Sequence, residues 1–144
     1  MRYLLDVNVL IALFDPDHTH HEASHRWWES VGKMPWATCP ITENGFARIL
    51  GNPNYPDSPG SPDAALIRLM EFTAATDHVF WPDSISLLDK TLFNNDTAYF
   101  SRQVTDIYLL ALARSNGGKL ATFDRRINAA AVQGGVEALH IIAI

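Results

Sequence analysis

The sequence predicts an α/β protein, a single-domain α/β/α sandwich built on a mostly parallel five-stranded sheet. Short apolar segments alternate five times with longer amphipathic ones, the pattern of a parallel sheet with helices on both faces. The chain has 144 residues, of which 47% are hydrophobic and 19% charged. That is long enough for one buried core and ordinary for a globular protein. We therefore expect residues 1–144 to form one domain.

The expected strands are short apolar runs bounded by turn residues. They cover residues 3–5, 36–41, 78–81, 119–123 and 139–144. Helices are expected where apolar side chains recur at helical spacing. They cover residues 9–14, 18–30, 42–50, 63–75, 84–93, 104–115 and 125–132. A proline-rich loop at 52–62 and a turn at 94–96 separate some of these elements.

The first predicted strand leads directly into an acid. Tyr3, Leu4 and Leu5 precede Asp6, and an apolar helix follows Asn8. We predict Asn8 as the helix N-cap, because its side-chain oxygen can accept a backbone N–H of the first turn. Asp6 would then lie at the carboxyl end of a strand, where open α/β sheets bind their ligands. The alternative is an acid that only interacts with the helix dipole.

Three further acids occupy equivalent places in the alternation. Glu43 and Asp106 fall in the first turns of predicted helices, and Asp124 follows the fourth predicted strand. These acids and Asp6 are therefore expected to share one cleft at the edge of the sheet. Clustered carboxylates repel one another unless a cation joins them, and all-oxygen ligands favour Mg²⁺ or Mn²⁺. Such a centre can activate water and stabilise a phosphodiester undergoing cleavage.

Composition narrows the class of protein further. The single cysteine, Cys39, excludes a disulfide framework and a cysteine zinc site. An acid at position 6 and the lack of a long apolar run argue against a signal peptide and a membrane span. We expect a cytoplasmic protein. The formal net charge of −5 argues against a general nucleic-acid coat, but it is compatible with a local basic rim.

Histidines and tryptophans give weaker signals. Four histidines crowd the second predicted helix, at His18, His20, His21 and His25. Zinc binding there would need a further converging ligand, so we favour a partly exposed, capped helix. Stacking on nucleobases is one possible role for tryptophan, but the core is the more common one beside strands and helices. We expect the core for all four, Trp27, Trp28, Trp36 and Trp81.

Four stretches resemble the PIN-domain ribonucleases, and more closely the VapC-type toxins of toxin–antitoxin pairs. They surround the four acids in the order of that family and together span nearly the whole chain. The stretches are LLDVNVLIAL around Asp6, TENGFARIL around Glu43, RQVTDIYLLALA around Asp106 and GGKLATFDRRI around Asp124.

The resemblance implies an α/β/α sandwich, RNA cleavage that depends on Mg²⁺ or Mn²⁺, a homodimer and a small antitoxin partner. It implies metal-ligand and catalytic roles for Asp6, Glu43, Asp106 and Asp124, supported by Asn8 and Thr122. Three arginines just beyond these acids are either RNA phosphate contacts or solvated surface. They are Arg48, Arg125 and Arg126.

Three other functions agree less well with the sequence. A haloacid-dehalogenase-like phosphatase would need a second acid two residues after Asp6, where the chain has Asn8. A receiver domain would need paired acids at the first strand and a lysine on the last, and neither is evident. A PIN fold kept only as a binding module is disfavoured by the complete set of acids.

Overall fold

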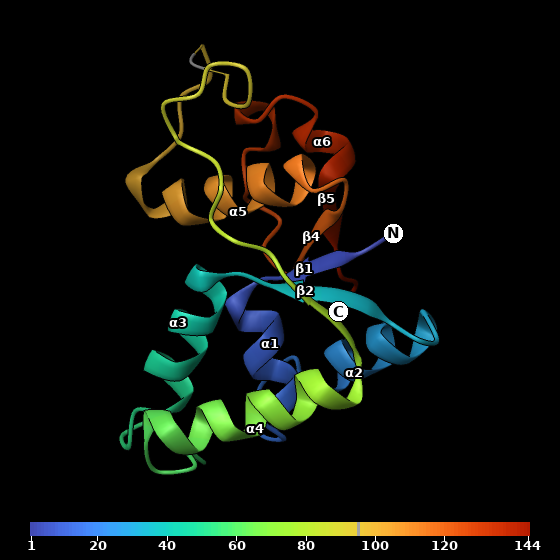
Figure 1. Cartoon of the computed structure of the whole chain (residues 1–144), viewed down its shortest axis with the longest axis vertical. Helices are drawn as coiled ribbons and strands as arrows, with labels where there is room; N and C mark the ends of the chain where they lie inside the picture. The colour runs from blue at the N-terminus through green and yellow to red at the C-terminus, as the bar shows by residue number, and fades with distance from the viewer. Residues whose placement is uncertain (95) are drawn as a thin grey trace.

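The computed structural model describes residues 1–94 and 96–144, and it has a central sheet with helices on both faces (Figure 1). The sheet has five strands in the order β3-β2-β1-β4-β5, and every neighbouring pair is parallel. The strands are β1 (Tyr3–Leu5), β2 (Pro35–Thr38), β3 (Asp77–Phe80), β4 (Lys119–Thr122) and β5 (Leu139–Ile141). The predicted fold class is confirmed.

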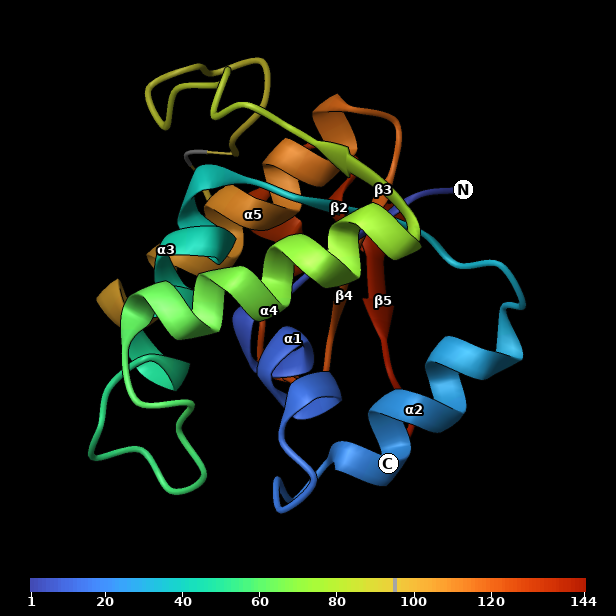
Figure 2. The same cartoon turned by 60° about the horizontal axis from the view of Figure 1, so that its bottom comes forward.

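Two helical layers enclose the sheet. One layer consists of α1 (Val7–Phe14), α2 (His21–Ser30), α3 (Pro40–Leu50) and α4 (Pro62–Ala75). The other consists of α5 (Val104–Ser115) and the short α6 (Gly135–Ala138). Figures 1 and 2 show the two layers on opposite sides of the sheet. Each layer packs its own hydrophobic cluster against one sheet face, with Leu4 and Leu120 in the α5 cluster and Leu5 and Ala121 in the α1 cluster.

The strand order places β1 at a topological switch point. From β1 the chain builds outward through β2 and β3 on one side, and it later returns to form β4 and β5 on the other. In open α/β sheets, ligands bind at such a point, outside the carboxyl ends of the strands. Asp6, directly after β1, and Thr122, the last residue of β4, lie on either side of it.

Local sequence explains where several helices begin. Pro40 and Pro62 occupy the first positions of α3 and α4, where a missing N–H costs nothing. The Ser61 hydroxyl caps α4 by accepting the Ala64 N–H at 3.1 Å. After α5 the chain turns at Gly117, whose φ of +73° disfavours other residues.

Two predicted helices were wrong. Residues 84–93 form irregular turns, and Leu88 in this segment is 88% exposed. Asp89 accepts hydrogen bonds from the Thr91 N–H and hydroxyl at 2.9 and 2.6 Å, a local alternative to helical bonds. Residues 125–132 contain only a 3₁₀ turn at Ala129–Ala131, and α6 follows later.

Smaller differences concern boundaries. α1 begins at Val7, so Asp6 holds the N-cap position and the prediction of Asn8 as the cap was wrong. α2 begins at His21 rather than His18. The predicted turn at 94–96 includes Asn95, which lies outside the described residues. Within the described ranges, no helix has the length and apolar character needed to cross a membrane.

Candidate metal centre

Asp6 is held at the switch point by β4 and by the first turn of α1. Its backbone N–H continues the β1–β4 ladder by donating to the Ala121 carbonyl at 3.0 Å, and its own carbonyl accepts the Leu10 N–H of α1 at 3.0 Å. The side chain is 8% exposed. Its Oδ2 accepts a hydrogen bond from the Thr122 hydroxyl at 2.8 Å. The backbone and one side-chain contact therefore fix both the place and the direction of this carboxylate.

Thr122 links Asp6 to a second acid. Its Oγ1 also accepts the Asp124 N–H at 3.0 Å, so one buried hydroxyl orders the ends of β1 and β4 together. Asp124 Oδ1 accepts the N–H of Arg126 at 2.8 Å and its Nε at 3.2 Å. Burial acts to raise the pKa of Asp124, but bonds from Arg126 and the charges of Arg126 and Arg102 hold it below its ordinary value.

Asp106 completes a group of three acids. It lies in the first turn of α5 and is half-buried. Burial, together with the smaller effects of the Asp6 and Asp124 carboxylates, raises the pKa of Asp106 to about 6. Burial likewise raises the pKa of Asp6, outweighing the hydrogen bond from Thr122. These mutual effects place the three carboxylates within electrostatic reach of one another.

No basic side chain pairs with Asp6 or Asp106 in the described part of the chain, whereas Asp124 is paired with Arg126. Among the described residues, ion pairs occur between Arg126 and Asp124 and between Arg2 and Asp77, and neither includes Asp6 or Asp106. Two carboxylates in a largely buried cleft without a basic partner are unfavourable at neutral pH unless a cation binds. Carboxylates are the donors that a hard divalent cation prefers, but the ligand oxygens of Asp6, Asp106 and Asp124 do not all lie within 4.8 Å of one another.

Glu43 is not brought to the same point. Its Oε2 accepts a hydrogen bond from the Thr38 hydroxyl at 2.8 Å, and the Thr38 oxygen lies 2.7 Å from His78 Nε2. Glu43 and His78 line a pocket formed with α4 residues, which includes none of the other three acids. Glu43 is therefore at the expected edge of the sheet, but its carboxylate points toward the β2–β3 side.

Two adjoining cavities open at this edge. The first, of about 500 Å³, is lined by Asp6, Asn8 and Arg48 together with residues of α3 and α5. The second, of about 590 Å³, is lined by Asn8, Asp124 and both Arg125 and Arg126. Exposed Asn8 belongs to both, so the cavities form neighbouring parts of one groove past Asp6 and Asp124, and Asp106 lines neither of them. All three predicted arginines line it.

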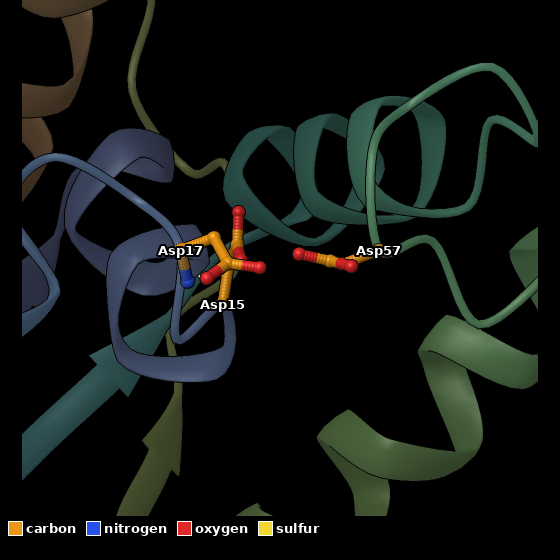
Figure 3. Close-up of side chains that lie close together, drawn as sticks. All are labelled: Asp15, Asp17 and Asp57. Carbon is orange, nitrogen blue, oxygen red and sulfur yellow. Dashed lines mark hydrogen bonds between the residues drawn. The ribbon is translucent and has the colours of Figure 1, made fainter.

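A separate acidic cluster lies at the other end of α1. In the part of the chain that the structure describes, Asp15, Asp17 and Asp57 are the one trio of metal-ligand type with oxygens within 4.8 Å of one another (Figure 3). α1 has eight residues, so about 12 Å of helix separates this cluster from Asp6. The buried Asp15 accepts bonds from the Tyr55 hydroxyl at 2.5 Å and the Asp17 N–H at 3.0 Å. These contacts tether the loop after α3, and the cluster is not part of the groove.

Comparison with known proteins agrees with the geometry. The PIN domain family matches residues 3–133 of the chain. The chain belongs to the PIN-domain family. Mycobacterium tuberculosis proteins named Ribonuclease VapC44 and Ribonuclease VapC39 are 44% and 42% identical to it. The first match covers 93% of this chain and 94% of the relative, and the second 96% and 100%. This PIN domain is thus of the VapC type, and a phosphatase or receiver assignment is not favoured.

The structure also settles the weaker sequence signals of this PIN domain. Trp27, Trp36 and Trp81 are at most 8% exposed, and Trp28 packs against the same core cluster as Trp36. The prediction that the tryptophans are core residues is confirmed. In the described part of the chain the histidines belong to no trio of metal-ligand type. The centres of the His21 and His25 rings lie 4.4 Å apart, but each ring has a nitrogen beside a backbone carbonyl, of Ala12 at 2.7 Å and of Leu13 at 2.9 Å.

One basic residue that acts on Asp124 was missed. Arg102 lies in the 3₁₀ turn Ser101–Gln103 before α5, and its charge lowers the pKa of Asp124. Its guanidinium carbon is 4.8 Å from the centre of the Phe100 ring. Its position four residues before Asp106 was the available signal, but the sequence does not give the path of the irregular segment that leads into α5.

Proposed function

We propose that this PIN domain, residues 1–144, is a divalent-metal-dependent endoribonuclease and the toxin of a toxin–antitoxin pair. The observation that carries the proposal is the group formed by Asp6, Asp106 and Asp124, three mutually repelling carboxylates at the switch point of the sheet. Relatives over nearly the whole chain carry the name ribonuclease, which supports the reaction class.

In this proposal Asp6, Asp106 and Asp124 hold Mg²⁺ or Mn²⁺. A bound divalent cation supplies a nucleophilic hydroxide at neutral pH and withdraws charge from the phosphodiester. Thr122 keeps the Asp6 carboxylate aimed at the cleft through its 2.8 Å bond. Asn8 lies between the two cavities, where it can donate to a phosphate oxygen. Arg48, Arg125 and Arg126 line the groove and place the RNA backbone.

Glu43 stays a predicted fourth ligand and catalytic acid. For this role its carboxylate must leave Thr38 and turn toward the other acids. A Glu43→Gln variant tests the role, because glutamine keeps an oxygen that can accept from Thr38 but removes the charge. Cleavage at the wild-type rate by this variant would assign Glu43 to the Thr38–His78 contact alone.

The partners that we propose follow from the VapC resemblance and from the charge of the groove. They are RNA as substrate, a small cognate antitoxin protein and a second copy of the chain in a homodimer. We further propose that the protein acts in the cytoplasm and without a membrane. Expression with and without a candidate antitoxin, followed by size-exclusion chromatography with light scattering, tests the two protein partners.

The decisive experiment is sequencing of RNA ends after brief expression of the wild type beside Asp6→Asn. We expect new 5′-phosphate ends and growth arrest only with the wild type, since water attack leaves a 5′-phosphate and a 3′-hydroxyl. Loss of a charge-stabilising ion contributes several kcal/mol to the barrier, so the rate should fall at least about 100-fold. Equal cleavage by Asp6→Asn would refute the carboxylate centre.

A purified assay separates this mechanism from metal-free cleavage. EDTA should abolish the reaction, and a substrate with one 2′-deoxy sugar at the cut should still be cleaved. A 2′,3′-cyclic phosphate product that survives EDTA would instead indicate attack by the 2′-hydroxyl with acid–base groups. A protein that binds RNA but does not cleave it under any of these conditions would be the non-catalytic binding module.

A further inference from the structure

The second cavity of the groove has an aromatic wall beside Asp124. His20 and Phe123 line it with ring centres 4.6 Å apart and planes inclined by 33°. His18 lines it too, with its ring centre 5.8 Å from that of His20. Both His20 and Phe123 are half-buried, so each ring leaves part of its surface to the cavity. The wall connects the turn before α2 with the segment after β4.

Packing fixes this wall in place. Phe123 packs against the hydrophobic cluster on the α1 side of the sheet, and it lies between Thr122 and Asp124, which are themselves joined by a hydrogen bond. His18 Nδ1 accepts the backbone N–H of His20 at 3.0 Å. That bond requires a deprotonated Nδ1, so the neutral His18 ring carries its proton on Nε2.

Charge distinguishes this cavity from an ordinary apolar pocket. Arg125 and Arg126 line the same space and are exposed, and the Arg126 side chain is 79% exposed despite its bond to Asp124. A stacking surface next to exposed guanidinium groups is the combination that binds single-stranded nucleic acid, with bases on rings and phosphates on arginines. The four tryptophans do not provide this surface, because they belong to the core.

We propose that the cavity over His20 and Phe123 is a nucleobase subsite, which receives one unstacked base of the RNA beside the phosphodiester held at Asp6 and Asp124. The inference rests on the proposed function, because it assumes that the acids mark the cleaved bond. The base stacks on the His20–Phe123 wall, its phosphate meets Arg125 or Arg126, and His18 Nε2–H offers a donor to the edge of the base. A paired base is already stacked in a helix and does not enter.

The test measures stacking directly and in the absence of cleavage. The full chain in EDTA is titrated against a short single-stranded oligouridine RNA with one central 2-aminopurine, whose fluorescence falls when it stacks. We expect quenching with the wild type, and an affinity about 5- to 150-fold weaker with His20→Ala or Phe123→Leu, the range for losing one stacked base. Phe123→Tyr keeps the aromatic face, so it should keep both the quenching and the affinity of the wild type.

Controls make the outcome specific. Phe80→Leu removes an aromatic side chain that is 47% exposed on β3, away from the groove, and should change neither signal. In the same RNA annealed to its complement the probe is already stacked, and adding the protein should cause no further quenching. Unchanged quenching and affinity in both His20→Ala and Phe123→Leu would overturn the subsite. His20 lies outside the helices and strands, so His20→Ala remains informative even if Phe123→Leu folds poorly.

The two proposals fail in different ways. If the wild type generates metal-dependent RNA ends but the aromatic variants bind the probe normally, the subsite is wrong and the nuclease function stands. If no RNA is cleaved, the proposed function is wrong, whatever the fluorescence titration gives.

Discussion

At the scale of single residues, Thr122 is the connection between two of the acids. Its buried hydroxyl donates to Asp6 and accepts from the Asp124 N–H. Thr122→Val keeps the shape but leaves both groups without that partner. We expect kcat/KM for RNA cleavage to fall about 10- to 100-fold, the usual cost of losing a group that orients a metal ligand. Thr122→Ser keeps the hydroxyl and should stay close to the wild type.

The measurement for Thr122 is a titration of activity against Mn²⁺ concentration. Thr122→Val should need more Mn²⁺ for half-maximal rate, because the Asp6 carboxylate is no longer held in one direction. A variant with an unchanged Mn²⁺ requirement and a lower melting temperature would show that Thr122 serves the fold rather than the centre.

Asp106 should make stability depend on pH. Its pKa is about 6 in the fold against an ordinary 3.8, so the folded protein binds this proton more tightly than the unfolded chain does. Without metal, its ionised form destabilises the fold above about pH 6, and this effect fades as pH falls toward about 4. Asp106→Asn should therefore be more stable than the wild type in EDTA at about pH 7.5, with a smaller difference at about pH 5.

Urea unfolding in EDTA at both pH values checks the Asp106 prediction. With saturating Mn²⁺ at the higher pH, the wild type should instead be more stable than Asp106→Asn. The ion then takes the place of the proton between the carboxylates. The same difference in stability between the two proteins at every pH would show that the pKa of Asp106 is not raised in the fold.

Sequence alone could predict the positions of Asp6, Asp106 and Asp124, because strand ends and helix starts meet at one edge of a parallel sheet. It could not predict where a side chain points. Glu43 is at the expected backbone position, but Thr38 holds its carboxylate on the β2–β3 side. Arg102 was missed for a related reason, since the path of an irregular segment is not encoded in a periodic pattern.

At the scale of elements, α1 and α3 meet where α3 has no side chain. A Cβ added at Gly45 would lie 2.8 Å from Val7 Cγ2. Gly45→Ala gains about 1 kcal/mol in helix propensity, but the overpacking costs about 1–3 kcal/mol. We expect a net loss of stability. In a Val7→Ala background the contact is gone, so the same Gly45→Ala change should stabilise the protein.

Chemical denaturation of the wild type, Gly45→Ala, Val7→Ala and the double variant measures the effect of Gly45→Ala on the free energy of unfolding in each background. If Gly45→Ala stabilised the protein in both backgrounds, α1 and α3 would be able to move apart without cost. The cleft between them would then be less rigid than the close approach of Gly45 to Val7 suggests.

Elements with strong periodicity could be predicted, and segments held by local side-chain bonds could not. α5 was predicted at its observed bounds, Val104–Ser115, because its apolar residues face the sheet. Residues 84–93 are also rich in apolar side chains, although less so than α5, but they remain irregular. Ser86 and Asp89 there accept backbone N–H groups two residues later, which satisfies the backbone without a helix.

At the scale of the whole molecule, the acids should couple metal binding to folding. An ion that binds only the native state stabilises it by about 2.7 kcal/mol at one hundred times its Kd. We expect Mn²⁺ to raise the melting temperature of the wild type and to do so much less for Asp6→Asn or Asp106→Asn. Asp57→Asn alters the cluster at the far end of α1 and should respond like the wild type. Loss of the shift in Asp57→Asn alone would place the ion at that cluster.

The loop between α3 and α4 divides the residues of the groove between two parts of the chain. Asp6, Asn8 and Arg48 precede the loop, and Asp106 and Asp124 follow it. A cut in the loop would thus yield two fragments, neither with a complete set of acids. β1 of the first fragment pairs with β4 of the second through three residues, and the centre forms only where they join. Fragment complementation would therefore make the nuclease conditional on bringing two separately expressed pieces together.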